Sequence, residues 1–227
     1  LAEKKFTDKF DHIMNELGIE TYDFVSSILA ESLFLFDDFV RDRYVAFFDV
    51  GYIVTDVVVA RGDGVLRQFS IPLGGGHITK ELRDDLSIRF SVAEKLKRKV
   101  VLNLEFGDND TYDINIKERV TSFSAHQVND IVTAKLSKLA RTINSCLMSC
   151  DLPPSTSYYL TGGGISYMTG ARDYLSKKLD RHVEIAKPKL PQYGKPHLST
   201  VLGLMDMVLG TDEEPRKKGL FARLFGR

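Results

Sequence analysis

Two glycine triplets constrain this chain more than any other feature of its sequence. Gly74-Gly75-Gly76 and Gly162-Gly163-Gly164 each follow a run rich in β-forming residues and precede a helical pattern. A glycine at such a junction lets the backbone approach another group closely because it has no Cβ. The N-terminus of the following helix offers free N–H groups to an anion. Either the two triplets build a nucleotide cleft, or both are tight turns and packing points between helix and strand.

The composition excludes some classes of protein. The 227 residues contain 31 Lys and Arg and 31 Asp and Glu, so no overall charge attracts nucleic acid. No apolar run is long enough to cross a bilayer. Cys146 and Cys150 lie four residues apart in a helical pattern, which we interpret as small buried apolar residues rather than half of a metal site. The sequence therefore predicts a protein of a reducing, cytoplasmic setting, without nucleic acid, and with no metal site of its own.

Hydrophobic periodicity and turn residues predict an α/β fold. Apolar positions at helical spacing predict helices over residues 6–17, 27–36, 79–86, 92–99, 125–150, 166–179 and 198–209. Runs of β-branched and aromatic residues predict strands over 22–25, 44–50, 53–60, 65–70, 100–106, 111–116, 157–161 and 182–185. We expect the strands from 44 to 70 to form a meander, and those at 100–106 and 111–116 to flank a turn.

Four segments, taken in order, resemble a known family. Residues 49–56, Asp-Val-Gly-Tyr-Ile-Val-Thr-Asp, resemble the second phosphate loop of actin and Hsp70-type ATPases, which in bacterial division proteins usually reads Asp-Ile-Gly-Gly-Gly-Thr-Thr-Asp. Residues 72–79 are similar to the segment that opens subdomain IIB, 93–97 to the adenosine-side helix and 161–164 to the adenosine motif. From about Val25 to Leu209 the order and spacing resemble the bacterial cell-division family FtsA.

This resemblance implies an actin-like, or ribonuclease H-like, domain II with an inserted mixed α/β subdomain IIB. Residues 1–40 would be a remnant of domain I and a connecting helix, residues 41–76 and 156–209 a split subdomain IIA, and residues 77–155 subdomain IIB. Residues 210–227 would be a linker and an amphipathic C-terminal helix. In the family, the first phosphate loop, the catalytic carboxylate of domain I and subdomain IC lie upstream of the position of Leu1.

The resemblance also implies a site for ATP with Mg that requires the upstream domain. Asp49 would lie near the metal and phosphates, glycine amides would hold the phosphate tail, and Glu94 and Lys97 would touch the ribose and base, with Arg98 stacking beside them. The sequence Ser91-Val92-Ala93-Glu94 is also a capping box, so Glu94 has a structural alternative. The residues implied at the cofactor site are Asp49, Gly51, Thr55, Gly75, Gly76, Glu94, Lys97, Gly162, Gly163 and Gly164.

The phosphate loop departs from the family pattern. Only Gly51 remains, because Tyr52, Ile53 and Val54 replace two glycines and the first threonine. β-Branched residues resist the φ > 0 geometry of a tight glycine loop, and their side chains fill the space that a phosphate would use. We therefore expect a degenerate site with at most weak ATPase activity, and we assign no catalytic residue.

The C-terminal residues have the pattern of a short basic amphipathic helix. At about 100° per residue, Leu220, Phe221, Leu224 and Phe225 span an arc of roughly 140°. Arg223 and Arg227 lie together on its flank. Such a helix is suited to lie in a membrane interface, so we expect these six residues to bind an anionic membrane surface. The entropy lost when the segment becomes ordered offsets most of the free energy gained by inserting these side chains into the membrane. One tail should therefore bind reversibly, whereas a polymer that carries many tails should bind tightly.

The resemblance implies a protein that tethers FtsZ filaments to the cytoplasmic face of the bacterial cell membrane at the division septum and self-associates into actin-like filaments. The FtsZ C-terminal peptide would dock on subdomain IIB, for which we name the basic positions Arg119, Lys135, Lys138 and Arg141. Two alternatives remain open: a PilM-like actin-fold adaptor of pilus assembly, which we would expect to lack the amphipathic tail, and an actin-fold ATPase.

Overall fold

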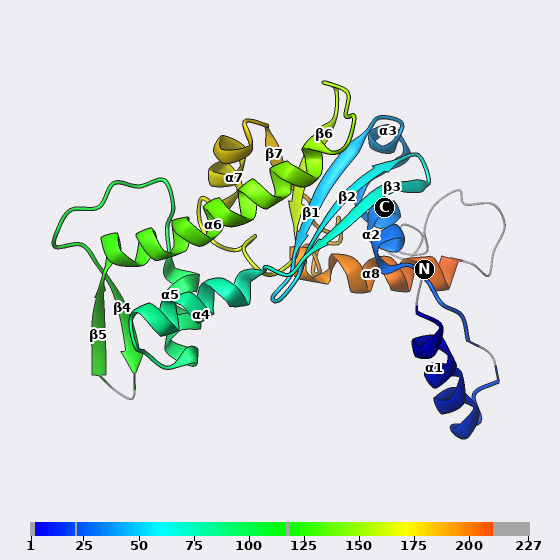
Figure 1. Cartoon of the computed structure of the whole chain (residues 1–227), viewed down its shortest axis with the longest axis horizontal. Coiled ribbons are helices and arrows are strands. Elements are labelled where there is room, and N and C mark those ends of the chain that lie inside the picture. Colours follow the sequence, from blue (N-terminus) through cyan, green and yellow to red (C-terminus); the bar gives the residue numbers. More distant parts are fainter. Residues whose placement is uncertain (1–2, 21, 117–118, 211–227) are drawn as a thin grey trace.

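A five-stranded mixed sheet forms the centre of the molecule (Figure 1). The computed structural model describes residues 3–20, 22–116 and 119–210. The strand order is β3-β2-β1-β6-β7, with β1 antiparallel to β2 and parallel to β6. The strands are β1 (Val45–Val50), β2 (Thr55–Arg61), β3 (Gly64–Ile71), β6 (Ser157–Thr161) and β7 (Val183–Ile185).

Strand β1 is buried on both faces, which explains its almost continuous apolar sequence. Val45 and Phe47 face a cluster with α2 (Ser27–Leu35), which packs along α8 (Ser199–Leu209). Phe48 and Val50 face the opposite cluster, to which α7 (Ala171–Leu179) contributes. The short α3 (Asp38–Arg41) connects α2 to β1.

A second lobe is inserted between β3 and β6 (left in Figure 1). It contains α4 (Gly75–Asp85), α5 (Phe90–Lys99), the two-stranded sheet β4 (Thr111–Ile116) and β5 (Arg119–Ser124), and the long α6 (Ala125–Met148). Helix α6 packs on α4 and on α7, so it runs from the insert to the sheet. One hydrophobic cluster extends from the sheet into the insert. It includes Phe48 of β1, Leu82 of α4, Leu96 of α5, Ile114 of β4 and Leu136 of α6.

Helix α1 (Lys4–Glu16) stands apart from the sheet and the insert (Figure 1). It has no buried residue. Its Phe10 contacts the rings of Phe6, Tyr22 and Phe24, which form a small aromatic cluster. The helix ends at Glu16, one residue before the predicted end, and Gly18 follows with φ +68°.

Several predicted elements are wrong. Residues 100–106 make only a single bridge, Val101 to Thr169, because the Tyr112 hydroxyl accepts the Val101 N–H. The partner of β4 is instead β5, which we did not predict. Residues 22–25 are not a strand. Helix α7 begins at Ala171 rather than 166, after Gly170 with φ +82°, and α4 begins inside the first glycine triplet rather than at Thr79.

The predicted capping box at the start of α5 is also wrong. The helix begins at Phe90 with Arg89 as its N-cap, so Ser91 lies inside the first turn and no side chain caps the helix. Glu94 therefore does not cap the helix, and its carboxylate makes the ion pairs described below.

Candidate functional site

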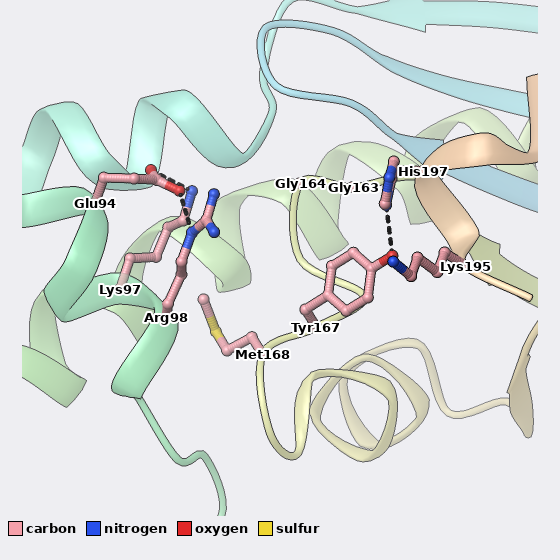
Figure 2. A pocket seen from close by; sticks show the side chains of 9 residues that line it. All are labelled: Glu94, Lys97, Arg98, Gly163, Gly164, Tyr167, Met168, Lys195 and His197. Carbon is pink, nitrogen blue, oxygen red and sulfur yellow. Dashed lines mark hydrogen bonds and ion pairs between the residues drawn. The ribbon is translucent and has the colours of Figure 1, made fainter. Parts of the chain in front are cut away.

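A pocket of about 430 Å³ lies between α5, the segment after β6 and the 3-10 helix η1 (Pro196–Leu198) (Figure 2). Its volume falls within the usual range for small-molecule sites, about 300–1,000 Å³. It brings together four of the cofactor residues implied by the sequence. The lining residues are Glu94, Lys97, Arg98, Gly163, Gly164, Tyr167, Met168, Lys195 and His197.

The first glycine triplet is packed against the phosphate loop. Gly75 donates its N–H to the Gly51 carbonyl at 3.0 Å, and Gly76 donates to the Tyr52 carbonyl at 2.6 Å. The Gly74 N–H donates to Nδ1 of His77 at 3.1 Å, so His77 acts at the helix start. The amides at the beginning of α4 are therefore bonded to the protein's own groups rather than open to an anion.

The second triplet makes equally close backbone contacts but also reaches the pocket. Gly164 donates to the Val50 carbonyl at 2.7 Å, and a Cβ at Gly164 would lie 2.2 Å from the Gly51 carbonyl oxygen. Gly162 has φ +84°, and a Cβ there would lie 2.2 Å from Oδ1 of Asp49. A Cβ does not fit at either of these two positions, which explains the glycines there.

Glu94 organises the α5 wall of the pocket. It forms ion pairs with Lys97 at 2.8 Å and Arg98 at 3.0 Å and accepts a hydrogen bond from Thr79 at 2.6 Å. Burial opposes the charged form of Glu94, but the hydrogen bonds from Lys97 and Thr79 outweigh it and lower the pKa of this carboxyl. We conclude that Glu94 is charged at neutral pH and has its acceptors largely engaged within the protein.

Lys97 is held between three groups. Its ammonium is 2.8 Å from Glu94 and donates to the Gly75 carbonyl at 3.2 Å, while the Tyr52 ring centroid lies 5.3 Å away. The residue is only 5% exposed. Burial lowers the pKa of Lys97, and the ion pair with Glu94 offsets this in part. Arg98, by contrast, has a side chain that is 75% exposed and can turn toward a ligand.

Tyr52 lies over the start of α4 and beside α5. A Cβ at Gly76 would be 2.7 Å from its ring, so the ring rests directly on that glycine. Burial, and then the nearby Glu94 charge, raises the pKa of the Tyr52 hydroxyl. Ile53 and Val54 continue the loop with exposed side chains. None of the three has a positive φ, so the loop takes a course that β-branched residues tolerate.

Asp49 sits among other carboxylates at the end of β1. It is paired in register with Asp56, and the Thr200 hydroxyl donates to it at 3.5 Å. Burial, and then the Asp56 charge, raises the pKa of Asp49 to about 6. Glu31 of α2 is fully buried, and neither of its carboxyl oxygens has a hydrogen-bond partner in the described part of the chain. Burial, reinforced by the Asp49 charge, raises the pKa of Glu31 to about 9.

The two ends of the implied nucleotide site differ in how well they suit it. The pocket offers a nucleoside a concave wall with Arg98, Lys195 and His197. The Thr55 hydroxyl already donates a hydrogen bond to the Leu73 carbonyl at 2.6 Å. Among the described residues, no group of three or more His, Cys, Asp or Glu side chains is arranged to hold a metal ion. The nucleoside end therefore fits a ligand, whereas the phosphate end lacks free donors at Gly75, Gly76 and Gly164.

Sequence reasoning missed four of the nine lining residues of the pocket. The Tyr167 hydroxyl and Nδ1 of His197 form a 2.6 Å hydrogen bond across its wall (Figure 2), and Met168 and Lys195 lie nearby. No motif marks these residues. Tyr167 and Met168 fall where we predicted a helix, and Lys195 and His197 come from the N-cap and the middle of η1, which lies against Gly163 of the second triplet.

The proposed partner contacts are scattered over the insert. Arg119 is exposed on β5, and Lys138 and Arg141 are exposed on α6. Lys135 is partly buried and pairs with Glu81 of α4 at 2.8 Å. The predicted membrane-binding residues, Leu220, Phe221, Arg223, Leu224, Phe225 and Arg227, lie outside the described residues. In the described part, no helix combines the length and apolar character needed to cross a membrane.

Comparison with family models gives a match to "Cell division protein FtsA" over residues 46–203, which is more than half of the chain. The chain belongs to the FtsA family. It is 22% identical over 192 residues to FtsA of Bacillus subtilis, covering 83% of this chain and 44% of that protein. It is 24% identical over 246 residues to FtsA of Rhizobium meliloti, covering 99% of this chain and 54% of that protein. The chain thus spans about half the length of these FtsA relatives.

Solved structures show that this FtsA-family chain has the actin-like fold. MreB5 of Spiroplasma citri, bound to ADP, superposes with a TM-score of 0.72 at 14% identity, covering 90% of this chain and 65% of that one. The PilM–PilN type IV pilus biogenesis complex contains a chain with a TM-score of 0.61 at 20% identity, covering 83% of this chain and 54% of that one. The predicted family and fold class are therefore confirmed.

Proposed function

We propose that this chain is part of an actin-like division protein that tethers FtsZ filaments to the inner face of the cytoplasmic membrane and scaffolds the division machinery. The observation that carries the proposal is the FtsA family match over residues 46–203. The sequence of residues 216–227 supports it, because two Leu and two Phe share one side of a helical wheel flanked by arginines. The PilM-like alternative shares the fold with this chain but provides no use for such a tail.

A co-sedimentation assay with anionic liposomes tests the tether. The intact chain, a chain cut after Pro215 and the variant Phe221→Glu would be compared with Phe39→Glu, which changes a 76% exposed phenylalanine of α3. We expect the intact chain and Phe39→Glu to pellet with the vesicles, and the other two to stay in solution. If all four stay in solution at low salt, where basic attraction is strongest, the membrane part of the proposal fails.

The FtsZ part of the proposal concerns the insert. The exposed Lys138 and Arg141 on α6 offer positive charge to a peptide, whereas Lys135 is already paired with Glu81. We expect the double variant Lys138→Glu/Arg141→Glu to weaken binding of the FtsZ C-terminal peptide about tenfold, and Lys135→Ala to change it less. Unchanged peptide binding in the double variant would show that the peptide docks on another surface.

We also propose that the pocket of Figure 2 binds an adenine nucleotide or nucleoside. Its size, its basic residues Arg98, Lys195 and His197, and the likeness to MreB5 bound to ADP support this. Bound ATP with Mg would supply a phosphate chain and a metal ion, which in relatives of this fold require the upstream domain. Self-association into filaments, and with it avid membrane binding through many tails, belongs to the same proposal.

A further inference from the structure

Tyr52 lies in the phosphate loop and is not one of the residues that line the pocket. We propose that Tyr52 makes the pocket selective for a nucleoside or nucleoside monophosphate over a nucleoside triphosphate. The inference rests on the proposed nucleotide pocket and goes beyond it, because it assigns a ligand class to this chain that differs from a triphosphate. Three observations on the described residues carry it.

The first observation is that three of the glycine amides implied at the phosphate chain are already used. Gly75, Gly76 and Gly164 donate to the carbonyls of Gly51, Tyr52 and Val50 at 3.0, 2.6 and 2.7 Å. A helix N-terminus attracts phosphate through free N–H groups. Since these donors are bonded to the loop itself, the start of α4 is closed to a phosphate chain.

The second observation is the place of the Tyr52 ring. It rests on Gly76 and lies 5.3 Å from the Lys97 ammonium, which donates to the Gly75 carbonyl at the start of α4. Glu94 neutralises this ammonium at 2.8 Å. A β- or γ-phosphate that extended from the pocket toward the loop would therefore meet an aromatic ring and a lysine that is already paired.

The third observation is the distribution of charge along the cleft. Arg98, Lys195 and His197 gather at the pocket, where a single phosphate could reach them. Beyond Tyr52 the loop continues with the apolar Ile53 and Val54, and the carboxyl groups of Asp49 and Asp56 belong to register partners where β1 ends and β2 begins. Because like charges repel, a phosphate chain that approached these two carboxylates would be destabilised.

Calorimetric titration of the intact protein with adenosine, AMP, ADP and ATP, with Mg²⁺ and again with EDTA, tests the inference. The wild type would be compared with Tyr52→Gly, which restores the glycine usual at this position, and with Tyr52→Phe, which keeps the ring. We expect the wild type and Tyr52→Phe to bind AMP at least about tenfold more tightly than ATP. In Tyr52→Gly we expect the ATP affinity to rise about tenfold while the adenosine affinity changes by less than about threefold.

Two results would overturn the inference. The first leaves the proposed nucleotide pocket intact, and the second refutes the pocket as well. Wild-type protein that binds ATP with Mg²⁺ as tightly as AMP, with the same ratio in Tyr52→Gly, refutes the role of Tyr52 and leaves the proposed nucleotide pocket standing. Protein that binds none of the four ligands, while its thermal unfolding is normal, refutes the nucleotide pocket together with the inference. The liposome assay is independent of both.

Discussion

The two glycine triplets have the same three residues and different surroundings. At Gly74–Gly76 the amides are bonded to the phosphate loop and the Tyr52 ring covers the last glycine. At Gly162–Gly164 the backbone packs equally closely on β1, yet Gly163 and Gly164 still line an open pocket. The difference teaches that glycine spacing identifies a place where backbones meet, whereas the neighbouring side chains decide whether a ligand can enter.

The largest expected effect comes from breaking the backbone packing that both triplets share. In Gly75→Ala or Gly164→Ala the new Cβ would lie 2.3 or 2.2 Å from a backbone carbonyl oxygen, so the main chain must move. We expect each variant to lower the free energy of unfolding by about 2–4 kcal/mol, measured by urea denaturation. Gly64→Ala is the control, since its Cβ would be 3.8 Å from the nearest heavy atom. Equal stability of all three variants would contradict the packing role.

A smaller loss of stability is expected when the ion pair of Glu94 and Lys97, beside the first triplet, is broken. Glu94→Ala leaves the Lys97 ammonium, in a residue that is 5% exposed, without its carboxylate. We expect a loss of about 2–3 kcal/mol, below the usual cost of breaking a fully buried pair because the Glu94 side chain is 22% exposed. Arg98→Ala, which removes the exposed partner of the same carboxylate, should cost less than about 1 kcal/mol. Similar losses in both variants would show that Lys97 is not confined as described.

The buried acids at the end of β1 and on α2 give a pH-dependent test. The pKa of Glu31 rises from 4.5 to about 9 on folding, so the folded state binds its proton more tightly and stability falls as pH rises between those values. In Glu31→Gln we expect the drop in melting temperature between pH 6 and pH 9 to shrink by about 3–6 °C. Calorimetry at both pH values measures it. An identical drop in wild type and variant would mean that Glu31 does not hold a proton in the folded protein.

The smallest effect sharpens the contrast between the open and the closed triplet. Arg98 lies at the mouth of the pocket and has a mostly exposed side chain. We expect Arg98→Ala to weaken AMP binding about three- to fivefold, an amount typical of one exposed charge contact. Arg83→Ala, on the exposed side of α4, is the matched control and should leave the affinity unchanged. Equal effects of the two substitutions would show that only overall charge matters.

The sequence predicted the sheet well because its strands carry strong local signals. Phe47 and Phe48 belong to an apolar run that is buried on both faces, and the turn at residues 61–64 fixes the hairpin of β2 and β3. It failed at β5, because residues 119–124 are mostly polar and exposed and thus have no hydrophobic pattern. Residues 100–106 are apolar enough for a strand, but they use a tyrosine hydroxyl and a single bridge instead.

The site was predictable only where a motif continues along the chain. Glu94, Lys97, Gly163 and Gly164 were named from the resemblance and meet at one pocket. Tyr167 and His197 could not be paired from sequence, because the contact joins residues 30 positions apart with α7 and β7 between them in the chain. The i,i+3 spacing on α5 predicts the contact of Lys97 with Glu94, but the contacts of Lys97 with Gly75 and Tyr52 arise only in the folded structure.

The hydrophobic cluster that runs from Phe48 in the sheet to Ile114 in the insert has a consequence for cooperativity. Lobes with separate cores can melt one after the other, whereas lobes that share buried side chains lose them together. The insert and the sheet should therefore unfold in one calorimetric transition, with slowly exchanging amides on both sides of their junction. A force or a partner that pulls on the insert would then also act on the core residues that surround the strand carrying Asp49.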